Sequence, residues 1–225
     1  MTSIHPNRIG YAISLGLLAA LGPLCIDLYL PALPALAADL QTPTATAQLS
    51  LTAGLLGLGA GQLIFGPLSD KTGRLRPLTL SLILLFIASV GCALAQNINQ
   101  LLLARLFEGL AGAGGAVLSR AIARDMYSGH DLTRFFAMLM LVNGLAPIAA
   151  PVMGGALMTF LDWRGLFMAL ALIALLLLAL ARLKLHETLP EERRSQGSLL
   201  SAWAALGKVV THRPFMGFCL TQGFM

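Results

Sequence analysis

The chain carries little charge. Asp, Glu, Lys and Arg make up 11% of its 225 residues, whereas soluble domains carry about 25%. Hydrophobic residues make up 57%, and the mean hydropathy is +0.79. These values exclude a soluble domain. At about 20 apolar residues per span, the chain has room for about six membrane-spanning helices and none for a separate enzyme domain.

Cysteine is also scarce. The three cysteines, Cys25, Cys92 and Cys219, are far apart and form no C-x-x-C pair, which excludes a disulfide framework and a zinc site. His186 and Glu187 lack the second histidine of a metalloprotease helix, and the sequence shows no Ser/His/Asp set. We therefore expect no metal, no cofactor and no enzyme activity.

Long apolar runs are what the sequence has in abundance. Leu, Ala and Gly dominate these runs without the period-2 alternation of a transmembrane barrel, so each run predicts a helix. Pro31 and Pro34 in the first run and Pro147 and Pro151 in the fifth predict bends. The expected fold class is an all-α membrane protein with six transmembrane helices. The six runs cover residues 9–37, 46–69, 77–95, 99–123, 135–160 and 164–184.

The basic residues predict the orientation of these spans. The net charge is +5, and of the 15 Lys and Arg residues all but Arg105 and Arg164 lie at the amino terminus, around alternate connections or after the sixth run. The positive-inside rule places these residues, and with them the amino terminus, in the cytoplasm. Because the charges alternate with spans and lack interleaved aromatic residues, we expect no nucleic-acid surface.

The sequence divides into three regions. Residues 1–189 are expected to form the transmembrane bundle, and residues 190–213 a cytoplasmic linker with an amphipathic helix at the membrane surface. Residues 214–225 begin a further apolar segment of 12 residues, which reaches only about 18 Å against about 30 Å of hydrocarbon. We expect this segment to be the truncated start of a seventh span, with a carboxy-terminal half missing.

Three charged residues lie inside the apolar runs and away from their ends: Asp27 in the first, and Arg105 and Glu108 in the fourth. Each costs about 2.5–3.5 kcal/mol on insertion scales and persists mainly beside a partner or a wet cavity. Arg105 and Glu108 share a helix face and can pair with each other. Asp27 can instead pair with Arg105, or stay protonated and exchange protons. In the alternative interpretation, Arg105 and Glu108 only staple helices and Asp27 lies at the outer interface.

The connection between the second and third runs concentrates glycine and charge. Gly66 is expected to allow close helix approach, and Gly73 to supply a permissive turn conformation. Asp70 can form an ion-pair latch with the basic residues around it. The segment reads Gly66-Pro-Leu-Ser-Asp70-Lys-Thr-Gly73-Arg74-Leu-Arg76-Pro77.

Segment 66–77 resembles the loop 2–3 signature of the major facilitator superfamily, G-x-L-x-D-x-x-G-R-x-R-P. Arg105-Leu-Phe-Glu108-Gly109 is similar to the R-x-x-Q-G signature of span four in proton-coupled members. Glu108 stands where that signature has glutamine, which adds a titratable group.

Residues 143–155 resemble the span-five antiporter signature that ends G-P-x-x-G-G, with Ala150 in place of its first glycine. Segments 27–34, 119–129 and 187–190 are similar to the Bcr/CflA subfamily of bacterial drug-resistance transporters. This resemblance covers nearly the whole chain and implies the amino-terminal half of a twelve-span major facilitator fold.

The resemblance also implies roles for particular residues. Proton and substrate handling would fall to Asp27, Arg105 and Glu108. The cytoplasmic latch would comprise Gly66, Asp70, Gly73, Arg74, Arg76 and Asp125. The packing and bending of span five would depend on Pro147, Pro151, Gly154 and Gly155.

The implied function is proton-coupled export of drug-like small molecules across the bacterial inner membrane, with the drug, protons and membrane lipid as partners. Two alternatives stay open: an uptake carrier of the same fold, or a truncated half with no transport activity alone. The turn Asp162-Trp-Arg164-Gly165 faintly echoes segment 70–74, as in inverted 3+3 repeats within each half of such transporters.

Overall fold

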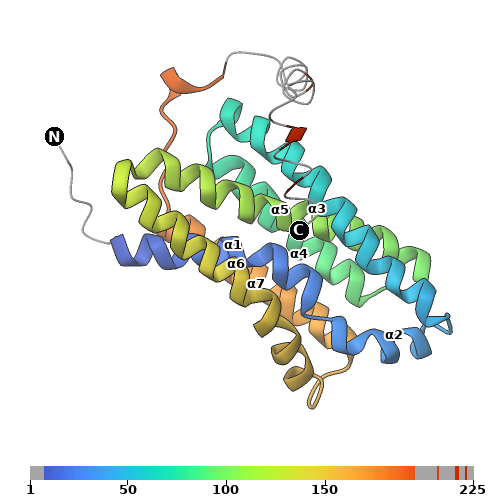
Figure 1. The fold of residues 1–225 in the computed structure, drawn as a ribbon. Coiled ribbons are helices and arrows are strands. Elements are labelled where there is room, and N and C mark those ends of the chain that lie inside the picture. The colour runs from blue at the N-terminus through green and yellow to red at the C-terminus, as the bar shows by residue number, and fades with distance from the viewer. Residues whose placement is uncertain (1–7, 196–206, 208–215, 218–220, 222–225) are drawn as a thin grey trace.

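The structure is a computed structural model that describes residues 8–195 and the isolated positions 207, 216, 217 and 221. The described part contains helices and no strand (Figure 1). In chain order the elements are α1 (Arg8–Asp27), η1 (Leu30–Ala32), α2 (Leu33–Asp39), α3 (Thr44–Thr72), α4 (Leu75–Ala93), α5 (Ile98–Met126), α6 (Gly129–Leu157), α7 (Trp163–Lys184) and η2 (Glu191–Arg193).

Six segments are long and apolar enough to cross a membrane. Each of α3 to α7 supplies one, and α1, η1 and α2 together supply the first. The predicted all-α fold with six spans is therefore confirmed. The helices extend past the apolar runs, most of all α6, which begins at Gly129, because polar residues can continue a helix at the membrane surface.

The first span is broken rather than bent. α1 ends at Asp27, Leu28 and Tyr29 form a turn, and a 3-10 turn follows before α2. Pro31 has no N–H to donate to the Asp27 carbonyl four residues earlier, which removes a hydrogen bond that a continuous helix would need at the break. Pro34 lies in the first turn of α2, where its missing N–H costs nothing.

Close backbone contact joins α3 to α5. A Cβ atom added to Gly57 of α3 would overlap the backbone oxygen of Leu106, and one added to Gly109 of α5 would overlap that of Gly54. Glycine therefore lets the two helices approach more closely than any side chain would allow, as in the small-residue interfaces of membrane helices. This seam sets the position of α5, the helix that carries the buried charges.

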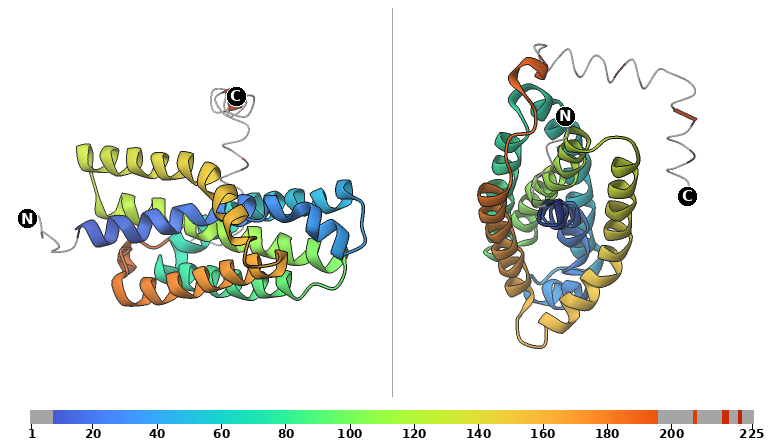
Figure 2. Two further views of the ribbon diagram at one scale, coloured as in Figure 1. Left: turned by 90° about the horizontal axis from the view of Figure 1, so that it is seen from below. Right: turned by 90° about the vertical axis from the view of Figure 1, so that its left-hand side faces the viewer.

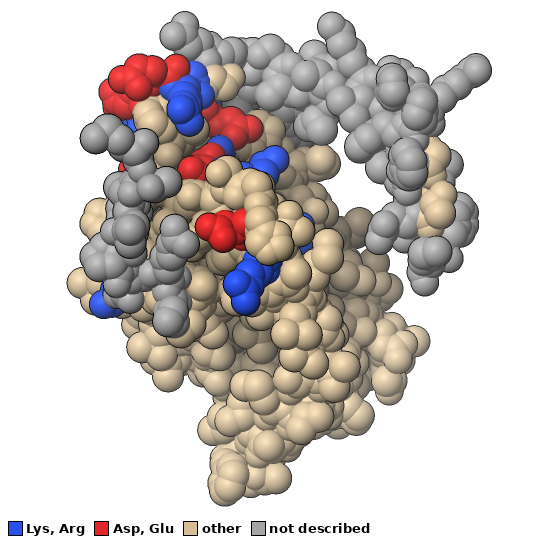
Figure 3. All heavy atoms as spheres, turned by 60° about the vertical axis from the view of Figure 1, so that its left-hand side comes forward, with Lys and Arg blue, Asp and Glu red and all other residues tan. Residues whose placement is uncertain are grey.

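Charged side chains gather at one end of the bundle. Figure 3 shows acidic and basic residues together at that end, while the rest of the visible described surface is uncharged. The start of α1, the α3–α4 and α5–α6 connections and the end of α7 all lie there (Figures 1 and 2). The chain is thus a multi-pass membrane protein, and the assignment of the charged end to the cytoplasm stays a prediction.

Two predicted features fall on residues that the structure does not describe. The amphipathic helix expected within 190–213 and the start of a seventh span at 214–225 lie outside the described residues, apart from the isolated positions already given. The three-region division therefore stays a prediction.

The α3–α5 seam gives a test of the fold. Gly57→Ala should lower the melting temperature in detergent by at least about 3 °C, because overpacking costs about 1–3 kcal/mol. Gly59 lies on the same helix, and a Cβ added there meets no atom within 4 Å, so Gly59→Ala is the matched control. If the two variants melt together, the close contact is wrong.

Candidate functional site

A fully buried ion pair lies within α5. Arg105 donates to Glu108 three residues later, and both side chains have no solvent exposure. From α4, Ser89 donates to one Glu108 oxygen at 2.9 Å, and the Cys92 thiol lies 3.6 Å from the other. Glu108 therefore accepts hydrogen bonds from side chains of both α4 and α5, and its ion pair with Arg105 has no net charge.

Arg105 also stabilises the end of α1. Its Nη1 donates to the Cys25 carbonyl at 2.7 Å, one of the carbonyls in the last turn of α1 that have no partner within the helix. The guanidinium stacks on the ring of Tyr29, 4.2 Å from the centroid, and Phe167 lies 5.7 Å away. Nε and Nη2 have no hydrogen-bond partner among the described residues, so these aromatic faces are their favourable contacts.

Asp27 lies in the chain between Cys25 and Tyr29, which both contact Arg105, but it is not bonded to this cluster. Its side chain is half-buried at the last residue of α1, and it makes no hydrogen bond or ion pair with any described residue. Of the two pairings that the sequence allowed for Arg105, the structure shows the one with Glu108. Asp27 is left as an unpaired carboxylate at the break in the first span.

The span-five signature contacts this break through one residue. A Cβ added to Gly154 of α6 would overlap the Leu28 carbonyl, directly after Asp27, whereas one added to Gly155 would meet open space. Pro147 is exposed and Pro151 half-buried. α6 changes direction in its second half (Figure 2), the half that contains both prolines.

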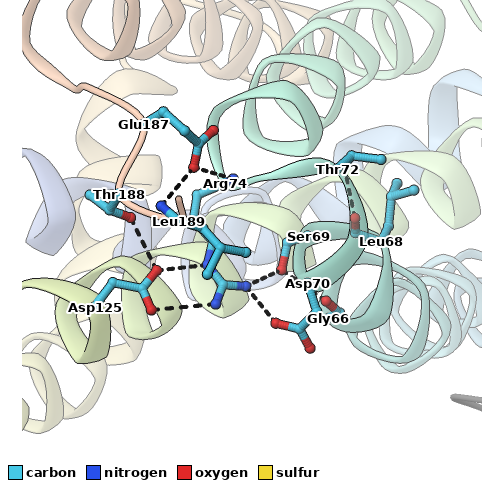
Figure 4. Close-up of polar contacts among 10 residues, drawn as sticks. All are labelled: Gly66, Leu68, Ser69, Asp70, Thr72, Arg74, Asp125, Glu187, Thr188 and Leu189. Carbon is cyan, nitrogen blue, oxygen red and sulfur yellow. Dashed lines mark hydrogen bonds and ion pairs between the residues drawn. The ribbon is translucent and has the colours of Figure 1, made fainter. Parts of the chain in front are cut away.

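A second cluster, which we call the Arg74 latch, joins α3, α4 and α5 at the charged end (Figure 4). Arg74 is buried and donates to Asp70 at 2.7 Å, to Asp125 at 2.8 Å and to Ser69 at 2.8 Å. Burial acts to lower the pKa of Arg74, but the bonds to Asp125 and Asp70 outweigh it and raise that pKa above its ordinary value. Arg74 therefore keeps its positive charge within the latch.

Glu187, which follows α7, completes the Arg74 latch. Its carboxylate accepts from the backbone N–H groups of Arg74 at 2.8 Å and Leu75 at 3.1 Å, which are unpartnered donors at the start of α4. Partial burial acts to raise the pKa of Glu187, but three backbone donors, Leu189 included, and the charge of Arg194 hold it below its ordinary value.

Gly73 has the geometry that its place in the Arg74 latch requires. Its φ is +90°, which only glycine adopts readily, and a Cβ there would lie 2.6 Å from the Glu187 carboxylate. The expected turn role of Gly73 therefore has two physical causes, the backbone angle and the approach of Glu187.

Two expectations for the latch are wrong within the described structure. Arg76 is exposed and makes no hydrogen bond or ion pair there. A Cβ added to Gly66 meets no atom within 4 Å, so no close helix approach depends on it in the described chain.

Three members of the latch were missed: Glu187, Ser69 and Thr188, whose hydroxyl donates to Asp125 at 3.1 Å. The segment 187–190 carried a subfamily resemblance, but nothing in its spacing pointed to residue 74, more than 100 positions earlier.

No group of three or more His, Cys, Asp and Glu residues within the described chain is placed to hold a metal ion. The chemistry available at both clusters is that of carboxylates and guanidinium groups, which form hydrogen bonds and ion pairs.

The described chain thus combines six spans, buried charges and a latch at a helix connection. The family model of the Major Facilitator Superfamily matches residues 15–225. The chain belongs to this superfamily, and it is a transporter chain rather than an enzyme.

Curated relatives agree with this assignment. The chain is 46% identical to an uncharacterized MFS-type transporter, YdgK, of Bacillus subtilis over 97% of its own length and 55% of the relative's. It is 32% identical to a bicyclomycin resistance protein homolog of Haemophilus influenzae, over 82% of this chain and 46% of that one. It is also 32% identical to the multidrug resistance protein MdtL of Escherichia coli, over 86% and 51%. The chain thus spans about half the length of these relatives.

Solved structures share the fold. The human organic anion transporter MFSD10 (TETRAN) superposes with a TM-score of 0.66 at 24% identity, and the proton:xylose symporter XylE with a TM-score of 0.65 at 18% identity. Each comparison covers 86% of this chain and 51% of the other. These likenesses show the fold alone.

The lowered pKa of Glu187 gives a pH-dependent prediction. The carboxylate stabilises the Arg74 latch above its ordinary pKa of about 4.3, and this stability is lost as the pH falls through the lowered value. Glu187→Gln should therefore melt about 2–4 °C below the parent at neutral pH. The difference should stay constant down to about pH 5 and close below about pH 4.3.

Thermal unfolding in detergent across this pH range measures the difference. Exposed Glu192 supplies the matched control, since Glu192→Gln removes a nearby carboxylate that makes no bond in the described structure. A difference that disappears between about pH 7 and pH 5 would contradict the assignment.

The buried pair predicts a graded response. Glu108→Ala leaves the Arg105 charge buried without its partner and should cost about 3–5 kcal/mol. Glu108→Gln keeps an acceptor for Arg105 and for Ser89, and should be clearly milder. Melting temperature and yield of monodisperse protein measure both. Equal losses for Ala and Gln would show that the acceptor oxygen is unimportant.

Proposed function

We propose that the chain is the amino-terminal half of a twelve-span, proton-coupled exporter of drug-like small molecules in the bacterial inner membrane, with the amino terminus in the cytoplasm. The names of two relatives at 32% identity, one for bicyclomycin resistance and one for multidrug resistance, support the substrate class. The clustering of charge at one end of the bundle supports the orientation (Figure 3).

The unpaired carboxylate of Asp27 carries the proposal. Arg105 and Glu108 form an ion pair in full burial, and leaving one charge of such a pair without its partner costs about 3–5 kcal/mol. Asp27 has no such partner among the described residues. Of the two intramembrane carboxylates, Asp27 is therefore the one that is free to exchange a proton.

The position of Asp27 links proton exchange to movement. It ends α1 directly before the break in the first span, and α6 contacts that break at the Leu28 carbonyl through Gly154. Intramembrane carboxylates mark proton and substrate pathways, and broken helices form the sites of many transporters. Protonation of Asp27 would compete with binding of a substrate, so inward proton flow could drive export.

Transport by the protein expressed from its complete gene tests the proton role. Inverted vesicles with an imposed proton gradient should accumulate a fluorescent drug, and Asp27→Asn should lower proton-driven accumulation at least about tenfold. Glu192→Gln, which removes an exposed carboxylate, is the control and should keep parental activity. Unchanged uptake in Asp27→Asn would rule out the proton role.

The direction and substrate class need a separate test, because a shared fold fixes neither. Thermal stabilisation should be measured with a panel of drugs, sugars, organic acids and peptides. Stabilisation by drugs is expected, and a response to nutrients alone would favour the uptake carrier. The 225-residue chain alone should show no saturable flux after reconstitution, since it spans about half of its relatives.

A further inference from the structure

A second arginine cluster lies at the end of the bundle away from the Arg74 latch. Arg164, in the first turn of α7, donates to Asp39 at 3.0 Å and to the carbonyls of Ala93 at 2.8 Å and Ala95 at 2.7 Å. Trp163 donates its indole N–H to the same Asp39 oxygen at 3.1 Å. The Arg164 guanidinium stacks on the Trp163 ring, with its Cζ atom 4.2 Å from the ring centroid. We call this set the Arg164 clamp.

The Arg164 clamp joins the ends of three elements. Asp39 is the last residue of α2, and Ala93 is the last residue of α4. Carbonyls at a helix end have no partner within the helix and carry partial negative charge. A planar guanidinium with several donors satisfies two of them and a carboxylate at once, which a lysine could not do with the same geometry.

The first three spans form one repeat and the last three form the other. The Arg74 latch and the Arg164 clamp each bond an arginine of one repeat to a carboxylate of the other. Arg74 opens the third span and binds Asp125, at the end of the fourth. Arg164 opens the sixth span and binds Asp39, at the end of the first. Each arginine thus bonds the final turn of the leading span in the opposite group of three spans, which is consistent with an inverted repeat.

The last spans of the two repeats, the third and the sixth, also bond each other, because the end of each contacts the start of the other. Glu187, after the sixth span, bonds the start of the third. The end of the third span, through Ala93 and Ala95, bonds the start of the sixth at Arg164. The sequence echo between segments 70–74 and 162–165 therefore corresponds to equivalent contacts at opposite ends of the bundle.

We propose that the Arg164 clamp is a second latch, which holds α2 in place and so positions the break that carries Asp27. α2 has only 7 residues and is separated from α1 by the break. Leu36 and Ala37 on its buried face pack into an apolar cluster with Trp163 and Phe167. Releasing the clamp frees α2 without unfolding α1. The consequence for transport rests on the proposed function, whereas the holding of α2 does not.

Thiol labelling tests whether the clamp holds α2. The protein is expressed from its complete gene with Cys219→Ser, since Cys25 and Cys92 are buried, and Ala37→Cys supplies a reporter at a site 5% exposed. Labelling by a membrane-impermeant maleimide should be slow in the parent. Arg164→Ala should accelerate it at least about threefold.

A double-mutant cycle identifies the clamp as the cause. Asp39→Ala should also accelerate labelling, and the double variant with Arg164→Ala should add little, because both changes remove one interaction. Asp39→Asn keeps an acceptor for both donors and should label more slowly than Asp39→Ala. Asn99→Ala, at an exposed polar residue of the same end, is the control. Unchanged or fully additive rates overturn the proposal.

Proton-driven drug efflux with the same variants tests the positioning role. Arg164→Ala should reduce efflux and shift its pH dependence at an unchanged amount of protein in the membrane. Faster labelling with unaltered efflux and pH profile overturns that role. If the parent itself exports no drug, the proposed function fails, while the labelling rates still decide whether the clamp holds α2.

Discussion

The buried guanidinium of Arg105 is the interaction on which the other features of this half depend. A cation inside a membrane bundle is tolerated only with compensating partners, and Arg105 finds them on three sides. It pairs with Glu108, donates to the Cys25 carbonyl and stacks on Tyr29. These contacts fix the end of α1 and the turn after it. The break in the first span is thus held open by the same residue that neutralises Glu108, which leaves Asp27 unpaired.

Arginine plays a comparable part at both ends of the bundle. Arg74 and Arg164 each join a carboxylate on one helix to groups at the ends of others. A planar guanidinium suits these junctions because its several donors point in fixed directions. Together with the glycine seam between α3 and α5, the three arginines make a body whose spans are tied at both ends and in the middle.

Much of this arrangement could be predicted from the sequence. The correct predictions rest on residues that are close together in the chain, whereas the missed contact of Glu187 joins distant segments. Six apolar runs are long enough to define spans, and Arg74 and Asp70 lie four positions apart in a segment that resembles a known signature. Gly66 and Arg76 matched the same signature, yet neither makes the expected contact within the described chain. Glu187 could not be found by spacing, because its contact with Arg74 spans 113 positions. A pattern gives residue types and helical faces, whereas contacts between distant segments need the packed bundle.

Proton release on drug binding tests the central claim most directly. A drug is added to the purified protein, expressed from its complete gene, in weakly buffered detergent solution near neutral pH, and the pH change is recorded. Because Glu108 is neutralised by Arg105 and Asp27 is not paired, the parent and Glu108→Gln should both release protons, and Asp27→Asn should release none. Proton release that persists in Asp27→Asn, or that disappears in Glu108→Gln while the drug still binds, would contradict the account.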